Sequence, residues 1–190
     1  MPSNAFEQIL GDLIGDAEDL NEARLQLPAG IAGIQRYHAA MNRSVVIGCV
    51  SAWEAYIESL VLESIQLLRP LGAPLGHWPV HNAFVRGQVG RFHNPNMENI
   101  RVLLSDSLGL QNVQHSWNWQ NSLAEQTIQR LAAVLNLRHQ IAHGVNPRPI
   151  VSNVFARQLP QFFARLAERT DHAVRDHLVD QLGISNPWPS

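Results

Sequence analysis

The sequence has no lysine, a single cysteine and no long hydrophobic run. The lone cysteine, Cys49, excludes a disulfide framework and fits either a reducing cytosol or a small buried apolar residue. The longest apolar segment, VVIGCVSAW, is far too short to cross a bilayer, and the N-terminus has neither the basic start nor the apolar stretch of a signal peptide. We therefore expect a cytoplasmic protein with no membrane partner.

Charged residues are unevenly distributed along the chain. The net charge of −2 argues against a protein that binds nucleic acid over its whole surface. Residues 1–22 contain six acids and no base, whereas residues 126–167 contain five arginines and no acid. Coding bias is the preferred explanation for the missing lysine, but the clustering of arginine, whose planar fork suits phosphate, remains informative.

Helical periodicity dominates the rest of the chain, and no alternating pattern indicates a strand. The length suits one domain over residues 1–190, for which we predict an all-α fold, a bundle of four main helices. These helices are expected at about residues 4–25, 34–68, 122–143 and 152–182. Pro160 should kink or interrupt the last of them. An irregular insertion at about 71–118, with short helices at 84–89 and 96–108, separates the second and third.

The third main helix ends in the segment RHQIAH, which holds the chemical candidates. Arg138 falls within an apolar stripe beside Leu131 and Leu135, where an unpaired guanidinium is costly. The guanidinium of Arg138 is therefore expected to contact a carboxylate, to face a cavity or to lie at a surface that a partner covers. The other face is neutral and includes His139 and His143, which suits either a half-buried groove or packing against other helices. An imidazole also exchanges protons near neutral pH, as a general acid or base must.

This segment resembles the R-x4-6-H signature of the HEPN superfamily, with Arg138 and His143 as its two ends. The stretches SAWEAYIESL and FHNPNMENIRVLLSDSLGL, followed by Trp117, resemble the RiboL-PSP-HEPN group of bacterial toxin- and defence-associated domains. Together these segments extend over about residues 41–166, which is most of the chain.

The resemblance implies a metal-independent endoribonuclease of toxin or defence type that needs no cofactor and acts on RNA. It implies cleavage to 2′,3′-cyclic phosphate and 5′-hydroxyl ends at a composite site across a homodimer, with an antitoxin or other protein as a further partner. His143 is then the general acid or base, and Arg138 stabilises the phosphate. His139 positions His143 or contacts RNA. Glu54 is the expected carboxylate partner of Arg138 or of a histidine, with Glu58 as the second choice. The alternative is that Glu54 only solvates its own helix.

Other interpretations remain open. Foremost is a non-catalytic helical dimerisation or RNA- or nucleotide-binding module, although no glycine-rich phosphate loop supports nucleotide binding. His139 and His143 also have the spacing of two metal ligands on one helix face. However, Gln140 stands where the metalloprotease motif needs glutamate, and no third ligand is evident, so we expect no metal. Base stacking is a further possible role for three tryptophans, with packing between helices as the preferred one: Trp78, Trp117 and Trp119.

Overall fold

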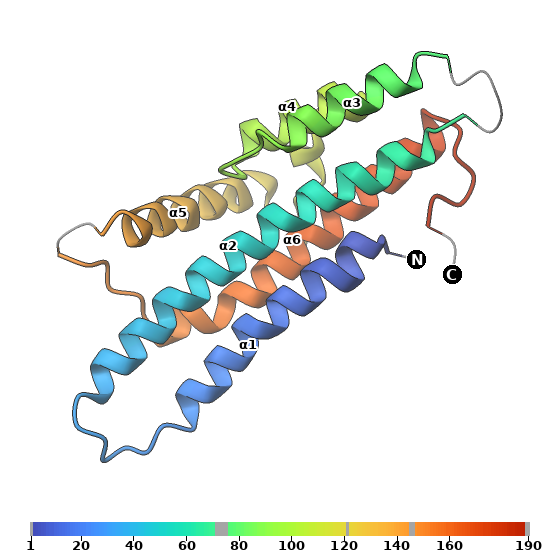
Figure 1. Cartoon of the computed structure of the whole chain (residues 1–190). Coiled ribbons are helices and arrows are strands. Elements are labelled where there is room, and N and C mark those ends of the chain that lie inside the picture. Colours follow the sequence, from blue (N-terminus) through green and yellow to red (C-terminus); the bar gives the residue numbers. More distant parts are fainter. Residues whose placement is uncertain (1, 71–75, 121, 145–146, 189–190) are drawn as a thin grey trace.

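The computed structural model describes residues 2–70, 76–120, 122–144 and 147–188. Its elements are helical, and within these ranges there is no strand, which confirms the all-α prediction (Figure 1). In chain order they are η1 (Ala5–Leu10), α1 (Gly11–Leu25), α2 (Ile34–Leu67), α3 (Trp78–Val89), α4 (Met97–Leu108), η2 (Val113–Ser116), α5 (Ala124–Ala142) and α6 (Asn153–Asp180).

The region expected to be an irregular insertion is more regular than predicted. The proline-containing segment from Trp78 onward was assigned to a loop, and only residues 84–89 to a helix, but α3 begins at Trp78. The reason is that Pro79 lies in the first turn, where a helix tolerates proline because the amide there has no helical acceptor. The expected loop at residues 71–75 lies outside the described residues.

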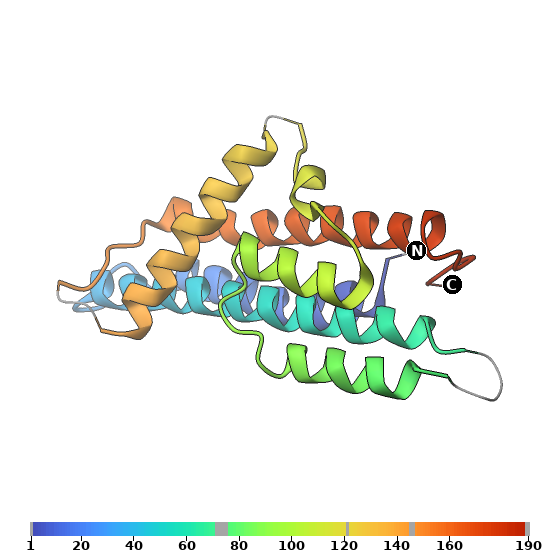
Figure 2. The same cartoon turned by 90° about the horizontal axis from the view of Figure 1, so that it is seen from above.

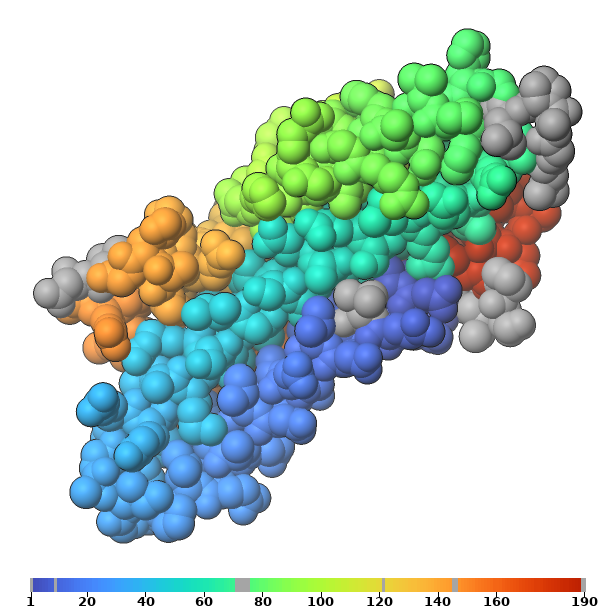
Figure 3. All heavy atoms as spheres, in the orientation of Figure 1, coloured from blue at the N-terminus to red at the C-terminus, as the bar shows by residue number. Residues whose placement is uncertain are grey.

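The four long helices do not form a regular bundle. Helices α1, α2 and α6 lie side by side, whereas α5 runs obliquely across them (Figure 2). It packs against α2, α4 and η2. In the space-filling view, the orange end of α5 lies over the first half of α2 (Figure 3). Because α5 crosses the other helices at an angle, a pocket can form on each side of it.

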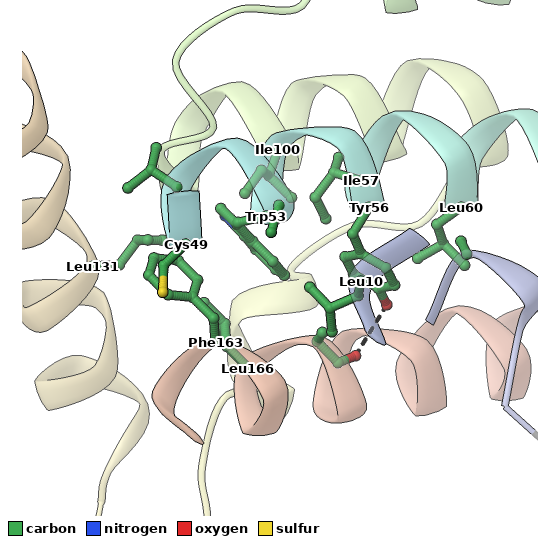
Figure 4. Close-up of a cluster of buried hydrophobic side chains, with 14 of the residues drawn as sticks. Leu10, Cys49, Trp53, Tyr56, Ile57, Leu60, Ile100, Leu131, Phe163 and Leu166 are labelled. Carbon is green, nitrogen blue, oxygen red and sulfur yellow. Dashed lines mark hydrogen bonds between the residues drawn. The ribbon is translucent and has the colours of Figure 1, made fainter. Parts of the chain in front are cut away.

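Helix α2 is the centre of the core and contacts every other helix of the domain except η2. Trp53 stacks on Tyr56 with ring centroids 5.5 Å apart (Figure 4). Its ring also makes an edge contact with Trp117, with centroids 6.3 Å apart. Trp117 is fully buried, as its predicted packing role requires. By length and composition α2 could span a membrane, but 56% of that apolar stretch is buried inside the protein, as expected of a core helix.

Cys49 also lies in this core, next to Leu131 and Phe163 (Figure 4). Burial raises the pKa of its thiol to about 12, with the negative charge of Glu18 acting in the same direction. The thiol therefore stays protonated at neutral pH, and Cys49 serves as a small apolar residue.

Of the kink or interruption predicted at Pro160, the interruption does not occur, because helix α6 is continuous through this residue. A proline inside a helix leaves the carbonyl four residues earlier without a donor, here that of Ala156. The Asn21 side chain of α1 donates to this carbonyl at 3.3 Å. A side chain from the neighbouring helix thus replaces the missing backbone hydrogen bond.

Two carboxylates hold the first residues of the chain against the core. Glu63 of α2 accepts hydrogen bonds from the amides of Asn4 and Ala5 at 3.1 and 3.0 Å. Asp171 of α6 accepts from the Ser3 amide at 3.1 Å and from the Ser3 hydroxyl. Amides at a helix start lack helical acceptors, so these bonds complete them. Burial raises the pKa of Asp171, although the bonds from Ser3 oppose that shift.

A buried polar cluster joins α1, α2 and the start of α6 at the opposite end of the domain. Arg24, which is 3% exposed, donates to the Oδ1 atom of Asn42. The Asn42 amide donates in turn to the Val151 carbonyl and to Oδ1 of Asn153, both at 2.8 Å. The cluster fixes the chain where it returns from the end of α5.

We expect Asn42→Ala to destabilise the protein by about 3 kcal/mol, because it leaves the buried Arg24 guanidinium with only the Asn153 carbonyl, 3.5 Å away, as acceptor. The free energy of unfolding in urea measures the effect. Asn136→Ala, which removes the same side chain from an exposed position on α5, is the matched control and should change stability by less than about 0.5 kcal/mol. Equal stabilities of the two variants would contradict a structural role for the cluster.

Candidate active site

The segment RHQIAH lies at the end of α5, where the sequence placed it. Leu131, Val134 and Leu135 are buried on the inner side of this helix. His143 is its C-terminal cap, and Gly144 follows with φ of 63°. This left-handed conformation favours glycine and ends the helix as predicted.

A cleft of about 400 Å³ opens between α5 and the segment that precedes α4. Its floor includes Val50 of α2, and Arg138 and His139 line it from α5. The full lining is Val50, Asn94, Pro95, Asn96, Ala132, Leu135, Asn136, Arg138 and His139. The volume lies within the range of about 300–1,000 Å³ that is typical of small-molecule sites.

The wall opposite α5 is a short segment held rigidly in place. The indole nitrogen of Trp53 donates to the Pro95 carbonyl at 3.1 Å, which ties this wall to the core. The Asn99 side chain donates to the Asn94 carbonyl at 2.8 Å, and Asn96 caps α4 by accepting from the Asn99 amide at 2.8 Å. Asn94 itself has φ of 58°, a left-handed conformation that asparagine tolerates better than most residues.

Sequence reasoning did not assign this wall to the site. The asparagine–proline–asparagine order before a helix was a usable signal, because it combines a turn residue, a fixed φ and an N-cap. The remaining signal, that this turn faces α5, depends on contacts between distant segments. Asn136 of α5, which the sequence analysis did not single out, is also in the lining.

Arg138 lies half-buried at the cleft and faces a cavity, one of the three environments expected for it. In the described part of the chain, no carboxylate lies within 4 Å of its guanidinium. Glu54 instead approaches His93, with Oε1 3.7 Å from Nδ1. Burial raises the pKa of Glu58, and the charge of Glu54 adds to that shift. The structure thus brings neither glutamate into an ion pair with Arg138.

His139 and His143 are both exposed and lie against each other, with ring centroids 4.2 Å apart. Only His139 lines the cleft, while His143 lies one turn further along, at the end of α5. Among residues 2–70, 76–120, 122–144 and 147–188, no group of three histidines, cysteines or acids is placed to hold a metal ion. The cleft therefore has one guanidinium and one imidazole among neutral amides, with a second imidazole stacked against the first outside its lining.

A family model described as RiboL-PSP-HEPN matches residues 12–176, a range that contains the whole cleft lining and the RHQIAH segment. Comparison with curated proteins and with solved structures found no match.

We expect Arg138→Ala to leave the free energy of unfolding unchanged within about 0.5 kcal/mol, or to raise it, because the guanidinium has no carboxylate partner. Arg24→Ala is the contrasting variant, since it removes a buried guanidinium that is hydrogen-bonded to Asn42. It should cost about 1–3 kcal/mol. Thermal unfolding of both variants measures the difference. A loss at Arg138 as large as that at Arg24 would mean that Arg138 is a structural residue.

Proposed function

The chain belongs to the RiboL-PSP-HEPN family, and from this premise we propose that it is a metal-independent endoribonuclease of toxin or defence type that acts in the cytoplasm. One observation carries the proposal. The guanidinium of Arg138 lines a cleft without a carboxylate partner in the described chain, the imidazole of His139 lines the same cleft, and the ring of His143 lies against that of His139. A cation in such a place suits an anionic substrate group, and in RNA that group is the phosphodiester.

The proposed chemistry uses the RNA's own 2′-hydroxyl as the nucleophile. His143 takes its proton, the 2′-oxygen bonds to phosphorus, and the bond from phosphorus to the 5′-oxygen breaks. A second imidazole returns a proton to that oxygen. The products are a 2′,3′-cyclic phosphate and a 5′-hydroxyl end, and no metal or cofactor is required. Arg138 stabilises the charge that develops on the phosphate oxygens.

The amides around the cleft suit RNA as the ligand. Asn94, Asn96 and Asn136 provide neutral donors and acceptors, which can bind sugar hydroxyls and base edges without competing with Arg138 for the phosphate. A carboxylate in their place would repel the substrate. A partner protein such as an antitoxin would suppress the activity if it covered this cleft.

The site is proposed to be completed by a second copy of the chain. Arg138 and His143 are five residues apart, or about 140° around the helix, so they do not project side by side. Only Arg138 of the two lines the cleft. In a homodimer with α5 near the two-fold axis, the motifs of both copies share one cleft.

The second candidate is a non-catalytic helical dimerisation or RNA-binding module. The observation in its favour is that His143 lies outside the cleft lining. Such a module would use Arg138 and the amides for binding, without proton transfer. Activity measurements separate the two.

We expect His143→Ala and Arg138→Ala each to abolish cleavage of a mixed-sequence RNA in buffer that contains EDTA. General acid–base catalysis contributes about 10²–10⁴-fold, so the loss at His143 should be decisive. His115→Ala, at an exposed histidine outside the cleft, is the matched control and should keep full activity. Gel analysis with end-group mapping gives both rate and products. RNA binding without any cleavage by the parent protein would favour the binding module.

A mixing experiment tests the composite site. We expect light scattering to give the mass of a dimer, and we expect an equimolar mixture of Arg138→Ala and His143→Ala protein to regain cleavage after subunit exchange. The regain follows because a mixed dimer carries one intact arginine and one intact histidine in a shared cleft. A monomeric mass at micromolar concentration, or a mixed dimer as inactive as either variant alone, would contradict the composite site.

A further inference from the structure

A second concavity, of about 210 Å³, lies between α5 and α6. We call it the Arg130 pocket. Its lining shares no residue with the cleft of Arg138 and consists of Trp119, Arg130, Gln158, Gln161, Phe162 and Arg165. The proposed nuclease chemistry leaves these residues without a role.

The pocket brings two positive charges together without a negative one in its lining. Arg130 comes from α5 and Arg165 from α6, within the stretch of residues 126–167 that contains no acid. In the part of the chain that the structure describes, the ion pairs within 4 Å involve neither of these arginines. Burial also lowers the pKa of Arg130, because its surroundings solvate the charge poorly. A bound anion would reduce the repulsion between the positive charges of Arg130 and Arg165.

Stacking fixes the orientation of the first guanidinium. Its central carbon lies 4.6 Å from the ring centroid of Phe162, a side chain that is 3% exposed. Phe162 is held in turn by Phe163 at 5.3 Å and by Trp119 at 6.2 Å between centroids. Contact with a ring occupies the face of a guanidinium, whereas its N–H donors point outward in the plane. Among the described residues, Arg130 makes no hydrogen bond that would use those donors.

The other polar side chains of the pocket provide hydrogen-bond donors from several directions. This arrangement suits a phosphate group better than a carboxylate, which has only two oxygens. Arg165, Gln158 and Gln161 are exposed at the rim, on consecutive turns of α6. A phosphate group has several acceptor oxygens and can bind a guanidinium through two of them. Half-buried Trp119 adds an aromatic surface on which a base can stack.

We propose that the Arg130 pocket binds a phosphate group, supplied by the backbone of a single-stranded RNA that extends beyond the cleft. The binding is independent of base sequence, because arginine contacts to phosphate carry no sequence information. The inference rests on the proposed binding of RNA at the cleft, but it concerns binding alone and stands whether or not the protein cleaves that RNA.

The test measures binding of a fluorescent single-stranded RNA, with every variant made in a His143→Ala background that prevents cleavage. We expect Arg165→Ala to weaken binding about tenfold at low salt. It should also reduce the slope of log affinity against log salt concentration by about 0.7, the value for one lost phosphate contact with a single strand. The loss should be similar for RNAs of different sequence.

Two further variants complete the design. Arg86→Ala removes the same charge from an exposed position on α3 and should leave affinity and salt slope nearly unchanged. Arg130→Ala should reproduce the loss at Arg165, and circular dichroism checks that removing the stack on Phe162 leaves the fold intact. Because Arg165 is exposed, its variant keeps the test valid if Arg130→Ala fails to fold.

Calorimetry with inorganic phosphate distinguishes the two sources of the phosphate group. Loss of both RNA and inorganic phosphate binding in Arg165→Ala supports the proposal in full. Loss of inorganic phosphate binding alone supports a phosphate site but overturns RNA as its source. Unchanged binding of both, or losses equal to those of Arg86→Ala, overturns the proposal. None of these outcomes depends on cleavage, so they are distinct from a failure of the nuclease assay.

Discussion

The packing of Trp53 at the centre of α2 is the interaction on which the rest of the structure depends. Its ring joins Tyr56, Trp117 and Phe163, so residues from α2, from the segment after η2 and from α6 meet on one side chain. Its indole nitrogen donates to the Pro95 carbonyl. The same residue therefore organises the core and positions the wall of the cleft, which makes the geometry of the cleft a consequence of core packing.

The oblique course of α5 gives the molecule two concavities of different character. Its inner face is anchored on α2 by Leu131 and Leu135, which leaves both flanks of the helix available. On one flank a single guanidinium faces neutral amides. On the other, the Arg130 guanidinium lies over the Phe162 ring, and Arg165 lines the same pocket. Had α5 lain along α6 as in a regular bundle, the second flank would have been filled by helix packing.

Local patterns predicted much of the fold and the position of the motif. Helical spacing gave the all-α class and the helices that became α1, α2, α4, α5 and α6 to within a few residues, because each has a continuous buried face. It also required a carboxylate, a cavity or a partner surface for Arg138, because a cation on an apolar stripe is costly if unpaired, and the structure places this side chain at the cleft. The Asn94 wall, the choice of His93 as the histidine that approaches Glu54, and the crossing of α5 could not be predicted, because each depends on contacts between segments far apart in sequence. The start of α3 was missed because Pro79 was taken as a loop signal.

The hydrogen bond from Asn21 to the Ala156 carbonyl has an evolutionary consequence. Pro160 makes that acceptor available by lacking an amide, and Asn21 is buried at the position that uses it. If another residue replaced Pro160, its amide would compete for the carbonyl, and the buried Asn21 would lose its acceptor. If Asn21 changed first, the carbonyl would be left without a donor. The two positions should therefore drift together, so that homologues without this proline favour an apolar residue where Asn21 stands.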